Sequence, residues 1–226
     1  MDSSSASNPR APHSSAQTLP PAYAVRGERE RLLEAMVRNA AAKGYEGTAV
    51  EDVTATAQLP RETFDSFFGS KQDCFLEAYD AVIDVVFAHV AAAYESAVGE
   101  PWPDRVVRAL RALVDLLASE ADIARMAIVE MPGVGEDARL RYRAALGRFA
   151  PFLDEGREFA PRAAELPPDT ASFAIGGLTS KLFDEVRAGR TDELRQLVPD
   201  LTFAVLVPYL GPEEAEAEMR RVAARG

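Results

Sequence analysis

The sequence predicts an all-α fold, with three short helices near the N-terminus and a larger body of longer helices behind them. Apolar residues recur at spacings of three and four along most of the chain, and no segment alternates apolar and polar residues with period two. Helix-starting and helix-ending residues separate these stretches at regular intervals. With 226 residues, 47% of them hydrophobic, the chain is long enough to bury a substantial core.

Composition divides the chain into three parts. Residues 1–22 are rich in Ser, Pro and Ala and lack apolar periodicity, so we expect a disordered tail. The three short helices fall in residues 23–70, which we predict to be the first domain. Residues 71–226 are predicted to form a second, larger helical domain.

The first helix is expected from Arg26 to Lys43. Its apolar residues at helical spacing mark one buried face, and Gly44 is expected to end the helix. These residues are Leu32, Leu33, Met36, Val37 and Ala40.

The second helix is expected to start at Thr48 and run to about Ala57. Thr48 and Glu51 have the spacing of a capping box, in which the threonine caps the helix and the glutamate bonds back to the cap. Gln58 and Leu59 follow, and Pro60 is suited to open the next helix because its φ angle fits the first helical turn.

The third helix is expected over Arg61 to Phe68, with Gly69 as a left-handed stop. Ser70 and Asp73 then have the spacing of a cap for a long fourth helix. Two short helices joined by a tight turn form a helix-turn-helix. By spacing, its inner face consists of Val53, Ala57, Leu59, Phe64 and Phe68.

Beyond Ser70 the pattern is helical throughout, and several of the segments are apolar on more than one face. Burial on several sides, and hence a layered helical body, is therefore expected. The expected helices are 71–98, 103–118, 120–131, 135–159, 169–188 and 192–210, followed by a polar segment at 212–225.

Two stretches resemble a known family. The residues from Gly44-Tyr45 through Thr48-Ala-Val-Glu-Asp-Val53 and Thr63-Phe64 to Phe68-Gly69-Ser70-Lys71 are similar to the DNA-binding domain of tetracycline-repressor (TetR/AcrR-type) regulators. The segment from Gly189-Arg190 to Leu210-Gly211 is similar to a common ending of such proteins. The resemblance implies a homodimer that binds double-stranded operator DNA and releases it when a small-molecule effector fills a pocket in the body.

The resemblance also implies which residues contact DNA. Thr48 and Lys71 match phosphate-contacting positions, and both lie at expected helix starts, where free N–H groups favour an anion. Arg61 is the best candidate for reading a guanine, through a bidentate contact. The remaining candidates on the third helix are Glu62, Thr63, Ser66 and Phe67.

Several residues depart from the family pattern. Asp65 replaces a Tyr that contacts the DNA backbone, Phe67 stands where His or Tyr is common, and Gln58 and Pro60 replace a Gly and a Ser at the turn. A carboxylate near phosphate disfavours binding. These departures raise an alternative function: a helical dimer that binds a small molecule or a protein but has lost specific DNA binding.

The resemblance also implies an effector pocket in the body and a dimer interface. The expected pocket residues are aromatic, Met or acidic residues on the body helices: Phe87, Trp102, Met126, Glu130, Tyr142 and Phe149. Glu130 is a candidate for recognising a cationic ligand, although a carboxylate paired with an arginine is the more common arrangement. The expected interface lies on segments 169–188 and 192–210 and includes Phe173, Gly176, Gly177, Leu197, Leu201 and Val205.

Charge and motif content narrow the function class. The formal net charge is −11, but residues 22–72 carry seven basic and eight acidic residues, so most of the acidity lies outside the first domain. A lone Cys74 and two histidines provide no metal-ligand set and no redox pair, so no cofactor and no metal are expected. Motifs of common enzymes are absent, which makes a helical enzyme the third choice. Without an export signal or an apolar run of membrane-spanning length, the protein is expected in the cytoplasm.

Overall fold

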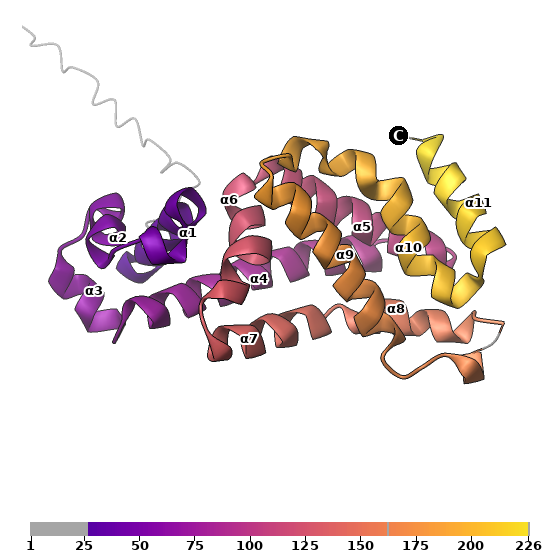
Figure 1. The fold of residues 1–226 in the computed structure, drawn as a ribbon, viewed down its shortest axis with the longest axis horizontal. Coiled ribbons are helices and arrows are strands. Elements are labelled where there is room, and N and C mark those ends of the chain that lie inside the picture. The colour runs from indigo at the N-terminus through magenta and orange to yellow at the C-terminus, as the bar shows by residue number, and fades with distance from the viewer. Residues whose placement is uncertain (1–26, 162, 226) are drawn as a thin grey trace, which may run out of the picture.

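The computed structural model describes residues 27–161 and 163–225, so the predicted tail at 1–22 lies outside the described residues. Within them the chain is helical and no strand is formed, as the sequence predicted. Figure 1 shows the three N-terminal helices gathered at one end, which we call the head. The long helix α4 (Lys71–Glu95) leads from the head into the remaining helices, which we call the body.

The head consists of α1 (Glu28–Gly47), α2 (Val50–Ala57) and α3 (Arg61–Phe67). Regular helical geometry in α1 is interrupted at Gly44, whose φ of 77° favours glycine, so the predicted end of the first helix is confirmed. The predicted inner face of the helix-turn-helix is also confirmed, because Val53, Ala57, Phe64 and Phe68 are buried. Leu59 is partly buried against the same core.

The predicted cap of α2 is wrong by one residue. The helix begins at Val50 with Ala49 as its cap, and the side chain of Asp52, not Glu51, accepts a hydrogen bond from the Ala49 N–H at 2.9 Å. Thr48 is buried and its hydroxyl donates to the carbonyl of Gly44 at 2.8 Å. The kink at Gly44 brings that carbonyl within reach, so Thr48 closes the end of α1 instead of opening α2.

The turn between α2 and α3 depends on Gln58, which adopts a left-handed conformation (φ 55°, ψ 46°). Glycine is the residue that usually takes this conformation without strain. By contrast, the left-handed stop predicted at Gly69 is wrong. Its φ is not positive, and α3 ends because Phe68 is extended (φ −131°, ψ 132°), which turns its ring into the core.

Helix α4 begins as predicted. The Ser70 hydroxyl accepts a hydrogen bond from the Asp73 N–H at 3.1 Å. The first turns of α4 belong to the head, where Phe75 packs against Tyr45 with ring centroids 4.7 Å apart. Its later turns are buried in the body, so one continuous helix joins the two parts.

The body is built from α5 (Trp102–Ser119), α6 (Ala121–Ala124), α7 (Glu136–Gly147), α8 (Ala150–Asp154), α9 (Thr170–Arg187), α10 (Val198–Leu210) and α11 (Pro212–Ala223). Short segments connect them: a π-helical turn η1 (Arg125–Glu130) and the 3-10 turns η2 (Met131–Gly133), η3 (Glu155–Glu158), η4 (Ala163–Glu165) and η5 (Thr191–Leu197). In Figure 1, α11 lies at the end farthest from the head and α7 runs beside α4.

Two predicted body helices are broken in the structure. The segment 135–159 divides into α7, α8 and η3 after Gly147, with Pro151 in the first turn of α8. The segment 192–210 divides into η5 and α10, with Pro199 in the first turn of α10. Proline lacks an N–H donor and disfavours the helix before it, which accounts for both breaks.

In the part of the chain that the structure describes, none of the helices is both long enough and apolar enough to cross a membrane.

Candidate nucleic-acid interface and ligand cavity

The outer face of α3 presents a small polar and aromatic surface. Arg61, Glu62, Asp65 and Ser66 are exposed on it, and the Phe67 side chain is 43% exposed. The opposite face holds Phe64 in the core, which fixes the orientation of the helix. The residues of the third helix expected to face outward therefore lie on one accessible surface. The candidate DNA contact Thr63 is half-buried, and its carbonyl accepts a hydrogen bond from the Ser66 hydroxyl.

Arg61 is engaged with two carboxylates of its own chain. Its guanidinium donates to Asp65 at 2.9 Å along α3 and to Glu51 on α2 at 2.6 Å. These hydrogen bonds, first the one to Asp65, raise the pKa of Arg61 above its ordinary value. Because all three side chains are about half exposed or more, the pairs are weak and can exchange for another anion.

The two expected phosphate contacts occupy different environments. Thr48 is buried, and both its hydroxyl and its N–H are used, the latter by the carbonyl of Tyr45 at 3.2 Å. Lys71 lies at the start of α4, where its ammonium donates to the Tyr45 carbonyl at 2.9 Å and lies 4.1 Å from the centroid of the Tyr45 ring. Of the two, only Lys71 is partly exposed.

Glu130 joins the body to the head. It lies at the end of η1, and one of its carboxylate oxygens accepts from the Arg125 guanidinium at 2.8 Å. The other accepts from the Tyr45 N–H, directly after the kink at Gly44, at 3.2 Å. The Glu130 side chain is only 10% exposed, so this contact is made away from bulk water.

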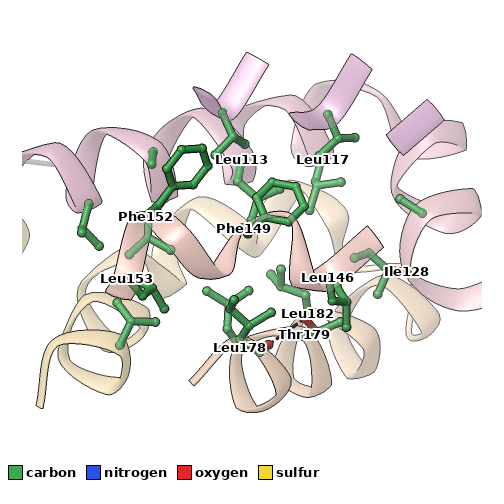
Figure 2. A pocket seen from close by; sticks show the side chains of 18 of the residues that line it. Leu113, Leu117, Ile128, Leu146, Phe149, Phe152, Leu153, Leu178, Thr179 and Leu182 are labelled. Atoms are coloured by element: carbon green, nitrogen blue, oxygen red, sulfur yellow. Dashed lines mark hydrogen bonds between the residues drawn. The ribbon is translucent and has the colours of Figure 1, made fainter. Parts of the chain in front are cut away.

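An apolar cavity of about 100 Å³ lies inside the body. Its wall comes from α4, α5, η1, α7, α8, α9 and α10, and none of the lining residues is charged. In Figure 2, Leu113 and Leu117 of α5 lie on one side and Leu178 and Leu182 of α9 on the other, with Phe149 between them. Thr179 supplies the wall's one hydroxyl, which donates to the Ile175 carbonyl of its own helix at 2.7 Å.

Most of the pocket residues expected from sequence do not line this cavity. Phe149 does, but Met126 and Trp102 are fully buried in the core, and Trp102 donates to the Phe152 carbonyl at 2.9 Å. Tyr142 is partly buried elsewhere in the core, and Phe87 packs behind Phe149 and Phe152. Glu130 is paired with Arg125, so the arginine-paired alternative is confirmed and the cavity holds no carboxylate for a cation.

The cavity wall is mostly aliphatic, whereas the sequence predicted mainly aromatic and sulfur-containing residues, and of the predicted residues only Phe149 lines it. A regular stripe on α5, consisting of Val106, Leu110, Leu113 and Leu117, faces it. That stripe has the spacing of one helix face and is visible in the sequence, but such spacing is equally typical of a filled core. Which apolar faces leave space between them depends on packing between segments remote in sequence.

The expected dimer residues divide between two faces. Phe173 is 73% exposed on α9, and Gly176 and Gly177 are exposed beside it. The prediction that Leu201 and Val205 lie at the interface is wrong, because both are buried in the core of their own protomer. Val205 also lines the cavity. Leu197 is partly buried against the core. On α10 the exposed positions are Asp200 and Ala204, one residue out of phase with the predicted face.

Comparison with known proteins identifies the fold. No protein-family model and no curated protein matches the sequence. Solved structures do match. The fatty acid degradation regulator FadR from Bacillus halodurans has a TM-score of 0.68 and 17% identity, over 79% of this chain and 97% of its own. FadR from Bacillus subtilis, solved with stearoyl-CoA, has a TM-score of 0.65 and 15% identity, over 80% and 98% of the two chains.

A TetR-family regulatory protein from Rhodococcus RHA1 covers more of the chain. It has a TM-score of 0.62 and 17% identity, over 87% of this chain and 97% of its own. These neighbours are transcription regulators, and this chain has the fold of the TetR family.

Proposed function

We propose that this chain is a ligand-responsive transcription regulator that binds double-stranded operator DNA through α3, acting as a repressor that a small-molecule effector releases. The observation that carries the proposal is the outer face of α3, which presents Arg61, Glu62, Ser66 and Phe67 on a head whose inner face is fully packed. A recognition helix held in this way can enter a major groove without loss of the core. Such a regulator acts in the cytoplasm, where the DNA is.

The proposed regulator is a homodimer. A two-fold axis relating two heads would place two α3 helices in successive major grooves, roughly 34–36 Å apart, on a near-palindromic site. The surface that we assign to the contact is the exposed face of α9 and α10 with Phe173, Gly176, Gly177 and Ala204. Phe173, which is 73% exposed, would bury apolar surface if a second copy covered this face.

On DNA, Arg61 exchanges its two carboxylates for a base and Lys71 meets a phosphate. Both exchanges are feasible because the ion pairs of Arg61 are exposed and Lys71 is only partly buried. For Thr48 we propose a positioning role, since its hydroxyl holds the end of α1 against the start of α2.

The effector site is the cavity in the body. FadR from Bacillus subtilis, with the same fold, was solved in complex with stearoyl-CoA, which supports a role in ligand binding for a cavity of this kind. A single short segment, η1, connects the cavity to the head. Ala127 and Ile128 of η1 line the cavity, and Glu130 of the same segment accepts a hydrogen bond from the Tyr45 N–H in the head.

The test of DNA binding is a fluorescence-anisotropy titration with DNA from upstream of the protein's own gene, at two salt concentrations. We expect saturable binding that weakens with salt and that Arg61→Ala reduces more for this DNA than for unrelated DNA. Equal loss on both DNAs would mean that Arg61 contacts phosphate and not a base.

A second candidate function is supported by the charge of the same surface. Arg61 is its one cation among Glu51, Glu62 and Asp65, which is unfavourable next to phosphates. A helical dimer that binds a small molecule without reading DNA would have such a surface. Flat titration curves at micromolar protein with every neighbouring promoter would favour this second function over the first.

A further inference from the structure

The residues that line the cavity determine the polarity of the ligand group that can be buried in it. None of the lining residues is charged, and the Thr179 hydroxyl already donates to the Ile175 carbonyl. A polar group placed in the cavity would lose its hydrogen bonds to water without replacement, which is unfavourable. The buried part of the ligand is therefore hydrocarbon. The volume of about 100 Å³ is of the order of an engineered apolar cavity of about 150 Å³ that binds benzene.

An aromatic cluster forms one side of the cavity wall and lies between the cavity and the guanidinium of Arg148. Phe149 and Phe152 line the cavity, and Phe87 contacts them with ring centroids 5.4 and 5.9 Å away. The Arg148 guanidinium lies over the outer side of this cluster, 4.3 Å from the centroid of the Phe87 ring. The break between α7 and α8 places Arg148 directly before the wall residue Phe149.

Arg148 is more available to a ligand than the other arginine near this cluster. Its partner is Asp84, at 2.7 Å, whose side chain is 71% exposed, so the pair is weak and exchangeable. Arg105, which lies over the Tyr94 ring, is only 16% exposed and is paired with Glu155. Glu155 is also held by the Tyr94 hydroxyl at 2.7 Å, so that pair is fixed.

We propose that the cavity binds the hydrocarbon tail of an anionic amphiphile, a carboxylate or a phosphate ester, with its head outside the aromatic cluster at Arg148. The proposal rests on the proposed function in that it assigns the chemistry of the effector at the same site. The tail enters past Phe87 and Phe149, and the anionic head replaces Asp84 as the partner of Arg148. Arg148 thereby selects anionic over neutral heads, while the wall selects for hydrocarbon.

The test uses Trp102, the chain's one tryptophan, as a reporter. It donates to the carbonyl of Phe152, a cavity-wall residue, so a heavy atom in the cavity quenches it at short range. Titration with dodecanoate carrying bromine at the chain end is expected to quench Trp102 saturably in the absence of DNA. Dodecanoate and dodecyl phosphate should reverse the quenching, and their relative potency tells carboxylate from phosphate heads. Dodecanol should compete more weakly.

Variants test each half of the site. Arg148→Ala is expected to lower the affinity for dodecanoate up to about five-fold and to leave that for dodecanol unchanged. Arg141→Ala is the matched control, because Arg141 pairs with Asp80 across α4 and α7 in the same way but does not contact the aromatic cluster. Ala109→Leu, which adds volume at a lining residue, should weaken the binding of all three ligands. Its unliganded fold is checked by circular dichroism.

The proposal is overturned if the brominated acid fails to quench Trp102 in the wild-type protein. Equal effects of Arg148→Ala on acid and alcohol, or equal effects of Arg141→Ala and Arg148→Ala on the acid, would also overturn it. These measurements contain no DNA, so they are independent of the operator titration. DNA binding without quenching refutes this inference alone, and quenching without DNA binding refutes the proposed regulator alone.

Discussion

The outward position of Arg61 can be predicted from sequence, but its ion pairs with carboxylates depend on the fold. Its outward position follows from the spacing of Phe64 and Phe68 on the inner face. Its two carboxylate partners follow only from the fold, because Glu51 lies on the preceding helix. The availability of Arg61 to DNA therefore depends on how readily Glu51 and Asp65 give it up.

Removing the charge of Asp65 is expected to strengthen DNA binding. Asp65→Asn frees Arg61 from one ion pair and removes a carboxylate from the surface that faces phosphates. From the strength of exposed pairs we expect affinity to rise by about two- to five-fold, as measured by fluorescence anisotropy at low salt. Glu213→Gln, which removes one exposed charge on α11 far from the head, is the matched control. Equal gains in both variants would assign the effect to net charge alone.

Glu185 is expected to make stability depend on pH in the acid range. Hydrogen bonds from Arg190 and then Lys181 lower the pKa of Glu185 from 4.5 to about 2. Since the folded pKa is depressed, the stabilisation is present above pH 4.5 and is lost as the pH falls towards about 2. Urea midpoints across this range should fall more steeply for the wild type than for Glu185→Gln. Parallel profiles would contradict the assignment.

The contact between η1 and the kink of α1 joins the body to the head. The Tyr45 N–H directly follows the non-helical residue Gly44, and it donates a hydrogen bond to the carboxylate of Glu130. A single π-helical turn within a helical segment is uncommon and often functional. Here it directs Glu130 to the head while Ala127 and Ile128 remain in the cavity wall.

Truncating Glu130 should loosen this junction. Glu130→Ala leaves the Tyr45 N–H and the Arg125 guanidinium without their acceptor, at an expected cost of about 1–3 kcal/mol in the free energy of unfolding. Amide hydrogen exchange measures the loosening directly, and the Tyr45 amide is expected to exchange faster in Glu130→Ala than in the wild type. Glu46→Ala, an exposed neighbour of Tyr45, is the control and should leave that amide unchanged. Unaltered exchange at Tyr45 in Glu130→Ala would refute the role of the contact.

The packing of η3 against α5 requires a glycine. A Cβ added at Gly156 would overlap the ring of Trp102, which is buried and held by the Phe152 carbonyl. Gly156→Ala is therefore expected to destabilise the protein by about 1–3 kcal/mol, measured by urea unfolding. Gly147→Ala is the control, since a Cβ there has no neighbour within 4 Å. Similar stability of the two variants would show that the Trp102 ring moves aside at little cost.

The outer face of α9 is the surface that a second copy of the chain would cover in the proposed dimer. A Cβ at Gly177 would meet nothing within 4 Å in its own protomer. A larger residue there is thus tolerated by the fold and opposes only a close partner.

The wild-type protein is expected to have a solution mass near twice 24.5 kDa by light scattering, and Gly177→Gln is expected to shift it towards the monomer. Thermal stability of the monomeric fold should not fall, because glutamine favours helices by more than glycine does. Ala217→Gln on exposed α11 is the control and should remain a dimer. A monomeric wild type would contradict the assigned interface.

The features that could be predicted from sequence depend on residues only a few positions apart. The helix-turn-helix follows from Gly44, Pro60 and the Ser70 cap together with apolar spacing, because helical hydrogen bonds and caps reach only about four residues. The short range of these interactions also explains why the predicted cap of α2 is wrong by one residue. Thr48 and Asp52 are both close enough to cap the helix, and the kink at Gly44 directs Thr48 to the end of α1.

The features that join remote segments depend on how the helices pack, and they could not be predicted from local sequence. The Glu130 contact spans 85 residues, and the cavity lies between helices from α4 to α10, so neither has a local signal. An apolar stripe such as that on α5 predicts burial but not whether the facing helices fill the space. Likewise, Leu201 and Val205 have interface-like spacing, and packing against the body placed them in the core, which left Phe173 and the glycines of α9 on the surface.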